Sequence, residues 1–176
     1  MRRWSPTLDE PIPQSEVAAL PTNQELIEKL KESILEIFSM MTSVHEKSAD
    51  DGAGENGQEQ IFDIEAIVRF HGRLEGYVVL RWSHEGAAEM ARGLLMAEPD
   101  EELEHEEITD AIGECANMVA GSLKTKALDP IASFSLGIPE VFSPITLKAG
   151  HKGGALVYDL TSGVMAAEIW LVDGEV

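Results

Sequence analysis

The most informative run in the sequence is Ile108-Thr-Asp-Ala-Ile-Gly-Glu-Cys-Ala-Asn-Met-Val-Ala-Gly121, which predicts an amphipathic helix with two distinct faces. Apolar side chains recur at helical spacing along one face: Ile108, Ile112, Cys115, Ala116, Val119 and Leu123. A second set recurs on the opposite face: Asp110, Glu114, Asn117 and Gly121. Because Glu114 and Asn117 are three residues apart, they lie about one turn from each other and point the same way.

The composition of the second face differs from that of an ordinary solvated helix face. Asn117 is a middling helix former, and Gly121 costs ~1 kcal/mol in a helix interior. A small residue lets another backbone approach closely, a carboxylate holds a cation, and a carboxamide both donates to and accepts from a water. An ordinary polar face with one glycine explains the same residues, because Glu-x-x-Asn alone is a weak signal.

Four positions resemble the motif of the CheC/CheX/FliY chemotaxis phosphatases: Asp110, Glu114, Asn117 and, after 21 further residues, Pro139. The segments Glu114–Gly121 and Ser135-Leu-Gly-Ile-Pro139 both look like CheX-type segments. The likeness covers the chain from about Asn23 to the C-terminus. CheC proteins typically carry two such helices, whereas this sequence has one. The resemblance is therefore closest to the single-motif CheX branch.

The resemblance implies a hydrolase that dephosphorylates the aspartyl phosphate of a CheY-like response regulator. Asn117 would orient the attacking water, and Glu114 would contact a lysine near the regulator's phosphorylation site. Asp110, Gly121 and Pro139 would support the docked partner: Asp110 at the interface or helix start, Gly121 by allowing close approach, and Pro139 by shaping the surface beside the helix. An acyl phosphate needs little covalent help, so placing a water is sufficient chemistry.

The resemblance also implies partners. The Mg²⁺ would belong to the regulator's acidic pocket, with no cofactor bound by this chain, and the chain would form a homodimer through its sheets. Two alternatives remain open. One is a non-enzymatic module that binds a response regulator through the same helix, and intact Glu114 and Asn117 favour the enzyme over it. The other is a phosphatase for a regulator outside chemotaxis.

The length of the chain indicates the number of domains, and its net charge excludes some classes of partner. The chain has 176 residues, enough for one domain, which we expect over 23–176 after an irregular, proline-containing tail over 1–22. The net charge of −19 argues against nucleic acid and against anionic membrane surfaces.

The compartment that the sequence favours is the cytoplasm. Cys115 is the single cysteine, so no disulfide can form within the chain. No apolar run follows the two N-terminal arginines, so we expect no signal peptide, and no segment approaches 18 apolar residues. The five histidines show no metal-ligand spacing.

The remaining patterns predict an α+β fold. We expect a helix over 23–43 with Asn23 as its N-cap, an acidic loop over 47–60, and a second helix that begins after Ser83 and ends near Met96. Expected strands are 61–70, 77–82, 131–136, 141–148, 155–160 and 164–172. Pro144 suits an edge strand, and Thr161-Ser-Gly163 predicts a hairpin turn. The order of elements predicts a largely antiparallel sheet covered by about three helices on one face.

Overall fold

The computed structural model describes residues 18–43, 45–46, 62–143 and 150–172. Its helices are α1 Asn23–Phe38, α2 His84–Leu95 and α3 His105–Leu123, and a π-helical turn, Lys124–Leu128, follows α3 directly. Its strands are β1 His45–Glu46, β2 Ile64–His71, β3 Glu75–Trp82, β4 Ser135–Leu136, β5 Glu140–Phe142, β6 His151–Asp159 and β7 Val164–Val172.

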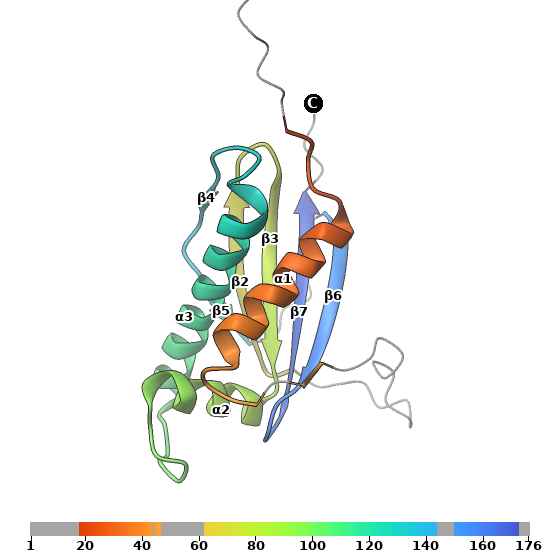
Figure 1. Ribbon diagram of the computed structural model, residues 1–176. Helices are drawn as coiled ribbons and strands as arrows, with labels where there is room; N and C mark the ends of the chain where they lie inside the picture. The colour runs from red at the N-terminus through yellow and green to blue at the C-terminus, as the bar shows by residue number, and fades with distance from the viewer. Residues whose placement is uncertain (1–17, 44, 47–61, 144–149, 173–176) are drawn as a thin grey trace, which may run out of the picture.

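The strands form one sheet in the order β1-β6-β7-β3-β2-β4, and β5 also pairs with β2. Every strand pair is antiparallel. Helices α1 and α3 lie across the same face of the sheet, and α2 lies at one end of it (Figure 1). This arrangement confirms the predicted α+β class, a largely antiparallel sheet with three helices, of which α1 and α3 cover the face and α2 lies at its end.

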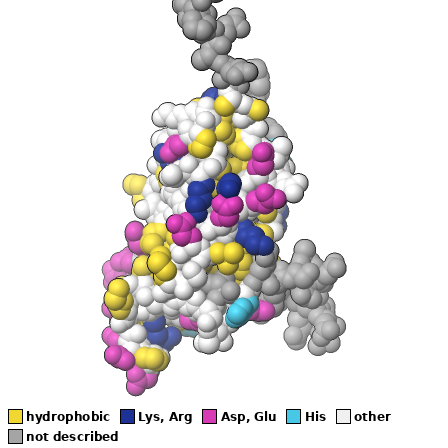
Figure 2. Space-filling view, in the orientation of Figure 1, with side chains coloured by type: hydrophobic (Ala, Val, Ile, Leu, Met, Phe, Trp, Pro, Cys, Tyr) yellow, Lys and Arg dark blue, Asp and Glu magenta, His cyan; other side chains and the backbone are white. Residues whose placement is uncertain are grey.

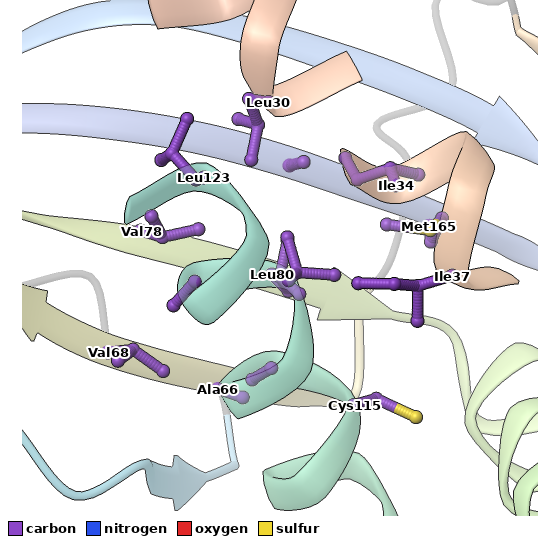
Figure 3. Close-up of a cluster of buried hydrophobic side chains, with 14 of the residues drawn as sticks. Leu30, Ile34, Ile37, Ala66, Val68, Val78, Leu80, Cys115, Leu123 and Met165 are labelled. Carbon is purple, nitrogen blue, oxygen red and sulfur yellow. The ribbon is translucent and has the colours of Figure 1, made fainter. Parts of the chain in front are cut away.

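The hydrophobic core lies between the sheet and the helices. Successive residues of a strand point to opposite faces of a sheet, so every second residue of β2 and β3 points its side chain toward α1 and α3. Figure 3 shows this cluster, with labelled side chains that include Leu30, Ile34, Ala66, Val68, Val78, Leu80, Leu123 and Met165. The stripe of α3 that was predicted to be apolar is therefore the stripe that attaches this helix to the sheet.

Two predicted hairpins are confirmed. Strands β2 and β3 pair from Ile64↔Trp82 to Phe70↔Gly76, and β6 pairs with β7 on either side of the Thr161–Gly163 turn. Ser83 caps α2, because its hydroxyl oxygen accepts the Gly86 N–H at 3.2 Å. Helix α2 ends at Leu95, with Met96 as its C-cap.

The first helix differs from the prediction at both ends. Thr22, rather than Asn23, is the N-cap: its hydroxyl accepts the Glu25 N–H, and the Glu25 carboxylate accepts the Thr22 N–H at 2.7 Å. The helix ends at Phe38 instead of residue 43, because the Phe38 carbonyl accepts both the Met41 and Thr42 N–H groups in a turn. A reciprocal capping box of this kind fixes the start of a helix.

The strands β4, β6 and β1 also differ from the prediction. β4 is shorter than 131–136, because the Leu128 carbonyl accepts the Ile131 N–H at 2.9 Å and makes that segment a turn. β6 begins at His151, before the predicted residue 155, and its pairing shifts register between Lys152 and Gly154. A Cβ on Gly154 would lie 2.3 Å from the Ile27 side chain, so glycine is needed there for close packing on α1. The two-residue strand β1 was not predicted.

Some predictions fall outside the described residues. These are the loop over 47–60, residue 61 of the strand expected over 61–70, residues 1–17 of the tail, and residues 144–148 of the strand expected over 141–148, of which β5 is the described part. The boundary between residues 22 and 23 stays a prediction. In the described part of the chain, no helix has both the length and the apolar character needed to cross a bilayer.

Candidate functional site

Helix α3 is fixed in place by its buried stripe. The residues of that stripe are Ile108, Ala111, Ile112, Cys115, Ala116, Val119, Ala120 and Leu123. At its start, the Glu107 carboxylate accepts the Glu104 N–H at 2.8 Å, and negative charge near a helix N-terminus is favoured by the helix dipole. The helix is therefore anchored along one side and capped at its start, and this fixes which residues face outward.

The outward stripe of α3 carries the predicted site. Asp110, Glu114 and Asn117 are exposed, at the i, i+4 and i+7 positions of one stripe. Cys115 and Val119 are fully buried beneath them, so the predicted division of the helix into two faces is confirmed. Asp110, Glu114 and Asn117 make no hydrogen bond or ion pair through their side chains with any other described residue. These polar groups are thus open to water and to a docking partner.

Gly121 extends the same stripe by four residues. It is half-buried, and a Cβ added to it would meet no atom within 4 Å. Packing within the described chain therefore does not require glycine here. The surface above Gly121 is open to an approaching backbone.

Pro139 lies in the segment between β4 and β5, which runs beside α3. β5 packs against α3, and Val141 Cγ2 lies 3.4 Å from a Cβ built on Gly113. Pro139 is about 7 Å along an extended chain from Val141, and Asn117 is about 6 Å along the helix from Gly113. The segment runs opposite to α3 (Figure 1), so both displacements point toward the same end of the helix. The segment that carries Pro139 therefore leads into β5, which packs against α3.

Ile138 is a site candidate that the sequence did not single out. Its side chain is 87% exposed, although isoleucine is among the residue types most often buried. It lies between Gly137, whose N–H donates to the Arg69 carbonyl at 2.8 Å, and Pro139. One sequence signal could have identified Ile138: it is an apolar residue between a glycine and a proline within the motif segment. Ile138 is thus an exposed apolar side chain directly before Pro139.

Cys115 is a fully buried core residue whose thiol is poorly suited to act as a nucleophile. Burial, reinforced by the neighbouring Glu114 charge, raises the pKa of the Cys115 thiol to about 12. A thiol with such a pKa carries almost no thiolate at neutral pH. Within the ranges that the structure describes, no cluster of three or more His, Cys, Asp or Glu side chains is arranged to hold a metal ion.

Comparison with known proteins identifies the family. The family model described as "Chemotaxis phosphatase CheX" matches residues 64–158, which is more than half of the chain. The chain therefore belongs to the CheX family. A search of curated proteins finds no match.

Solved structures share the fold. The chemotaxis protein CheX from Vibrio vulnificus aligns with a TM-score of 0.68 at 19% identity, over 86% of this chain and 99% of that one. The CheX–CheY–BeF₃–Mg²⁺ complex from Borrelia burgdorferi aligns with a TM-score of 0.62 at 16% identity, over 88% and 100%. FliY from Thermotoga maritima aligns with a TM-score of 0.51 at 16% identity, over 83% and 84%.

Proposed function

We propose that this member of the CheX family hydrolyses the aspartyl phosphate of a CheY-like response regulator. The family is described as a chemotaxis phosphatase, and one protein of similar fold forms a complex with CheY. The observation that carries the proposal is the pair Glu114 and Asn117: both are exposed neighbours on α3, and their side chains bond to no other described residue. Groups already satisfied within their own chain are not available to a substrate.

Asn117 would supply the chemistry by placing a water. Its carboxamide has an oxygen that accepts and an NH₂ that donates, so it fixes both the position and the orientation of one water. That water attacks phosphorus in line with the aspartyl oxygen. A new P–O bond forms and the bond to the aspartyl oxygen breaks, so the regulator keeps its aspartate carboxylate and inorganic phosphate leaves with the water's oxygen and both of its hydrogens. Holding the reactants in line accounts for most of the catalysis that such a reaction needs.

Glu114 would hold the regulator. Its carboxylate is one turn from Asn117, so a lysine bound to Glu114 fixes the phosphoryl group relative to the carboxamide. Asp110, Gly121 and Pro139 would extend the contact along the same side, and Ile138 would contribute apolar area. The Mg²⁺ would belong to the regulator, and no residue of this chain is assigned to it.

We also propose that the chain forms a homodimer along a sheet edge. The β4–β5 edge lies beside α3 and would compete with the regulator, so the edge at β1 and β6 is the one to test. Light scattering at micromolar concentration should give twice the chain mass. A monomer mass would contradict the dimer without affecting the phosphatase proposal.

The test of the function follows the decay of a phosphorylated regulator. A CheY-like regulator is phosphorylated with acetyl phosphate, excess donor is removed, and loss of phosphate is timed with and without this protein. Accelerated decay supports the proposal. Binding of the regulator with unchanged decay would instead support the non-enzymatic module, and neither binding nor acceleration would make the proposal wrong.

A further inference from the structure

A groove lies at the end of the molecule where the C-terminal end of α1, helix α2 and the β6–β7 turn meet. Its volume is about 520 Å³, and its lining includes Met41, Gly93, Met96 and Pro99. Five large hydrophobic side chains are exposed in the described part of the chain, and three of them, Met40, Leu95 and Met96, belong to this end. Methionine is flexible and polarizable, and it is common on surfaces that bind peptides.

The walls of this methionine groove are tied together. The Glu89 carboxylate accepts the Thr42 hydroxyl, the Thr161 N–H and the Ser162 N–H, which links α2 to the turn after α1 and to the β6–β7 turn. A Cβ on Gly93 would lie 2.5 Å from the Met41 carbonyl oxygen, so the two backbones are in close contact. The groove is thus formed in advance of any ligand, which lowers the cost of binding.

Met96 has an unfavourable backbone conformation, and packing of its side chain within the chain does not offset the cost of that conformation. It is the C-cap of α2 with φ 54° and ψ 35°, a left-handed conformation that favours glycine. Of the described residues other than glycine, it is the only one with positive φ. Its side chain is 92% exposed, so packing within the chain does not explain a methionine there.

Pro99 of the groove lining belongs to a strongly acidic segment, which is called the acidic rim below. The segment 98–107 after α2 contains seven exposed carboxylates and no lysine or arginine: Glu98, Asp100, Glu101, Glu102, Glu104, Glu106 and Glu107. Arg92 is the one basic residue of the groove lining, and its Nε donates to the Glu101 carbonyl at 3.0 Å. Figure 2 shows hydrophobic patches among carboxylates at this end of the molecule.

We propose that the methionine groove binds an amphipathic helical segment of a partner protein. Its apolar side chains would rest on Met41 and Met96 of the groove lining, and its lysines or arginines would face the acidic rim. Charge decides between occupants: a second copy of this chain, with a net charge of −19, or an anionic lipid surface would bring negative charge against the rim. This surface is separate from the exposed stripe of α3, and the proposal does not depend on the phosphatase chemistry.

The probe for this proposal is a fluorescent peptide of about 18 residues, five helical turns, with leucines at helical spacing on one face and lysines elsewhere. Anisotropy measures its affinity for the full chain. Two control peptides are a scrambled one of the same composition and one with glutamate in place of lysine. We expect each to bind at least about tenfold more weakly, because each lacks one of the two complementary features. If the scrambled peptide bound equally well, charge attraction alone would account for the binding, and the proposal would be overturned.

The matched variants are Met96→Gly in the groove and Leu20→Ser, an exposed apolar residue near the start of α1. Met96→Gly should weaken the amphipathic peptide about fivefold or more, as truncation of a contributing interface residue does. Its melting temperature should stay equal or rise, because glycine suits the left-handed cap. Leu20→Ser should leave the affinity unchanged. Equal losses in both variants, or none in Met96→Gly, would overturn the proposal.

The other occupants are tested with the same variants. Light scattering shows whether Met96→Gly changes the mass of the parent protein, and co-sedimentation with phosphatidylglycerol vesicles shows whether it changes lipid binding. We expect no change in either measurement. A dimer lost in Met96→Gly would assign the groove to a second copy, and vesicle binding lost in it would assign the groove to a lipid surface. Either result would overturn the peptide proposal.

Discussion

Two glutamates of this chain have opposite surroundings. Glu114 on α3 is exposed, and no described residue pairs with its carboxylate. Glu168 on β7 is buried, and its two oxygens accept from Arg81 at 2.9 Å, from Lys152 at 2.7 Å and from the Trp170 indole at 2.8 Å. The second carboxylate is held by its own fold, whereas the first is available to another molecule.

The difference separates residues that stabilise the fold from residues that serve a partner. Arg81 also donates to Glu65 at 2.6 Å, so one guanidinium joins carboxylates from β2 and β7 across β3. Burying charges costs free energy that good geometry only offsets, and removing Arg81 would take their shared cation from Glu65 and Glu168, although Lys152 and the Trp170 indole would still donate to Glu168. Truncation in the network should therefore lower stability, and truncation on the α3 stripe should lower function while stability is kept.

The largest expected effect is on stability, from Arg81→Ala. The free energy of unfolding should fall by about 3–5 kcal/mol, because Glu65 and Glu168 stay buried without their shared cation. Urea unfolding followed by circular dichroism measures it. The matched control is Arg69→Ala, since Arg69 is half-exposed and 3.5 Å from the exposed Glu140, and such a pair contributes about 1 kcal/mol or less. Similar losses in both variants would remove the distinction between the two environments.

Next in size is the loss of activity in Asn117→Ala. At saturating regulator, we expect dephosphorylation to be about 100-fold slower than with the parent protein, because the attacking water would no longer be held in place. The unfolding midpoint should stay equal or rise, because alanine is the better helix former and Asn117 is exposed. Gln24→Ala, an exposed carboxamide on α1, is the control and should keep the parental rate. A folded Asn117→Ala that works at the parental rate would make the assigned chemistry wrong.

Patterns within one element were sufficient for much of the fold. The two faces of α3, the capped start of α2 at Ser83 and both hairpins follow from local spacing and turn residues. The Gly153–Gly154 part of β6 was missed, because glycine has low strand propensity and its role is to admit Ile27 of α1. The two-residue strand β1 depends on pairing with β6, far along the chain, so no local pattern indicates it.

The same limit applies to the polar residues. Spacing predicted which side of α3 carries Glu114 and Asn117, because a helix fixes both on one element. It could not predict that Glu65, Arg81 and Glu168 meet, since their contact depends on the register of three strands. Ile138 was missed for a related reason: the exposure of an apolar side chain is decided by what the fold places over it. Whether the α3 stripe performs the proposed chemistry stays a prediction.

A smaller effect is expected for Glu114→Ala, on binding. Affinity for a beryllofluoride-activated regulator should fall by about 1–2 kcal/mol, because a carboxylate–lysine contact at an interface contributes to binding. Asn117→Ala should weaken the same binding less. Titration calorimetry measures both, with Glu28→Ala on the exposed side of α1 as the control. If Asn117→Ala weakens binding more than Glu114→Ala does, the two roles are assigned the wrong way round.

The smallest effect is on the pH dependence of stability, and Glu168 decides its sign. Burial alone would raise the pKa of Glu168, but hydrogen bonds from Lys152 and Trp170, with the charge of Arg81, outweigh it and lower that pKa below 4.5. The unfolded chain therefore binds a proton at a higher pH than the folded chain does. The stabilisation that this carboxylate contributes is complete above about pH 4.5 and is lost as the pH falls through the lower, folded pKa.

Glu168→Gln keeps much of the shape and loses the charge, so its unfolding free energy should fall less steeply below pH 4.5 than that of the parent. Urea unfolding at a series of pH values measures the slope, and Asn117→Ala, which changes no titrating group, should follow the parent. Parallel slopes for the parent and Glu168→Gln would mean that the buried network does not hold this carboxylate in its charged form.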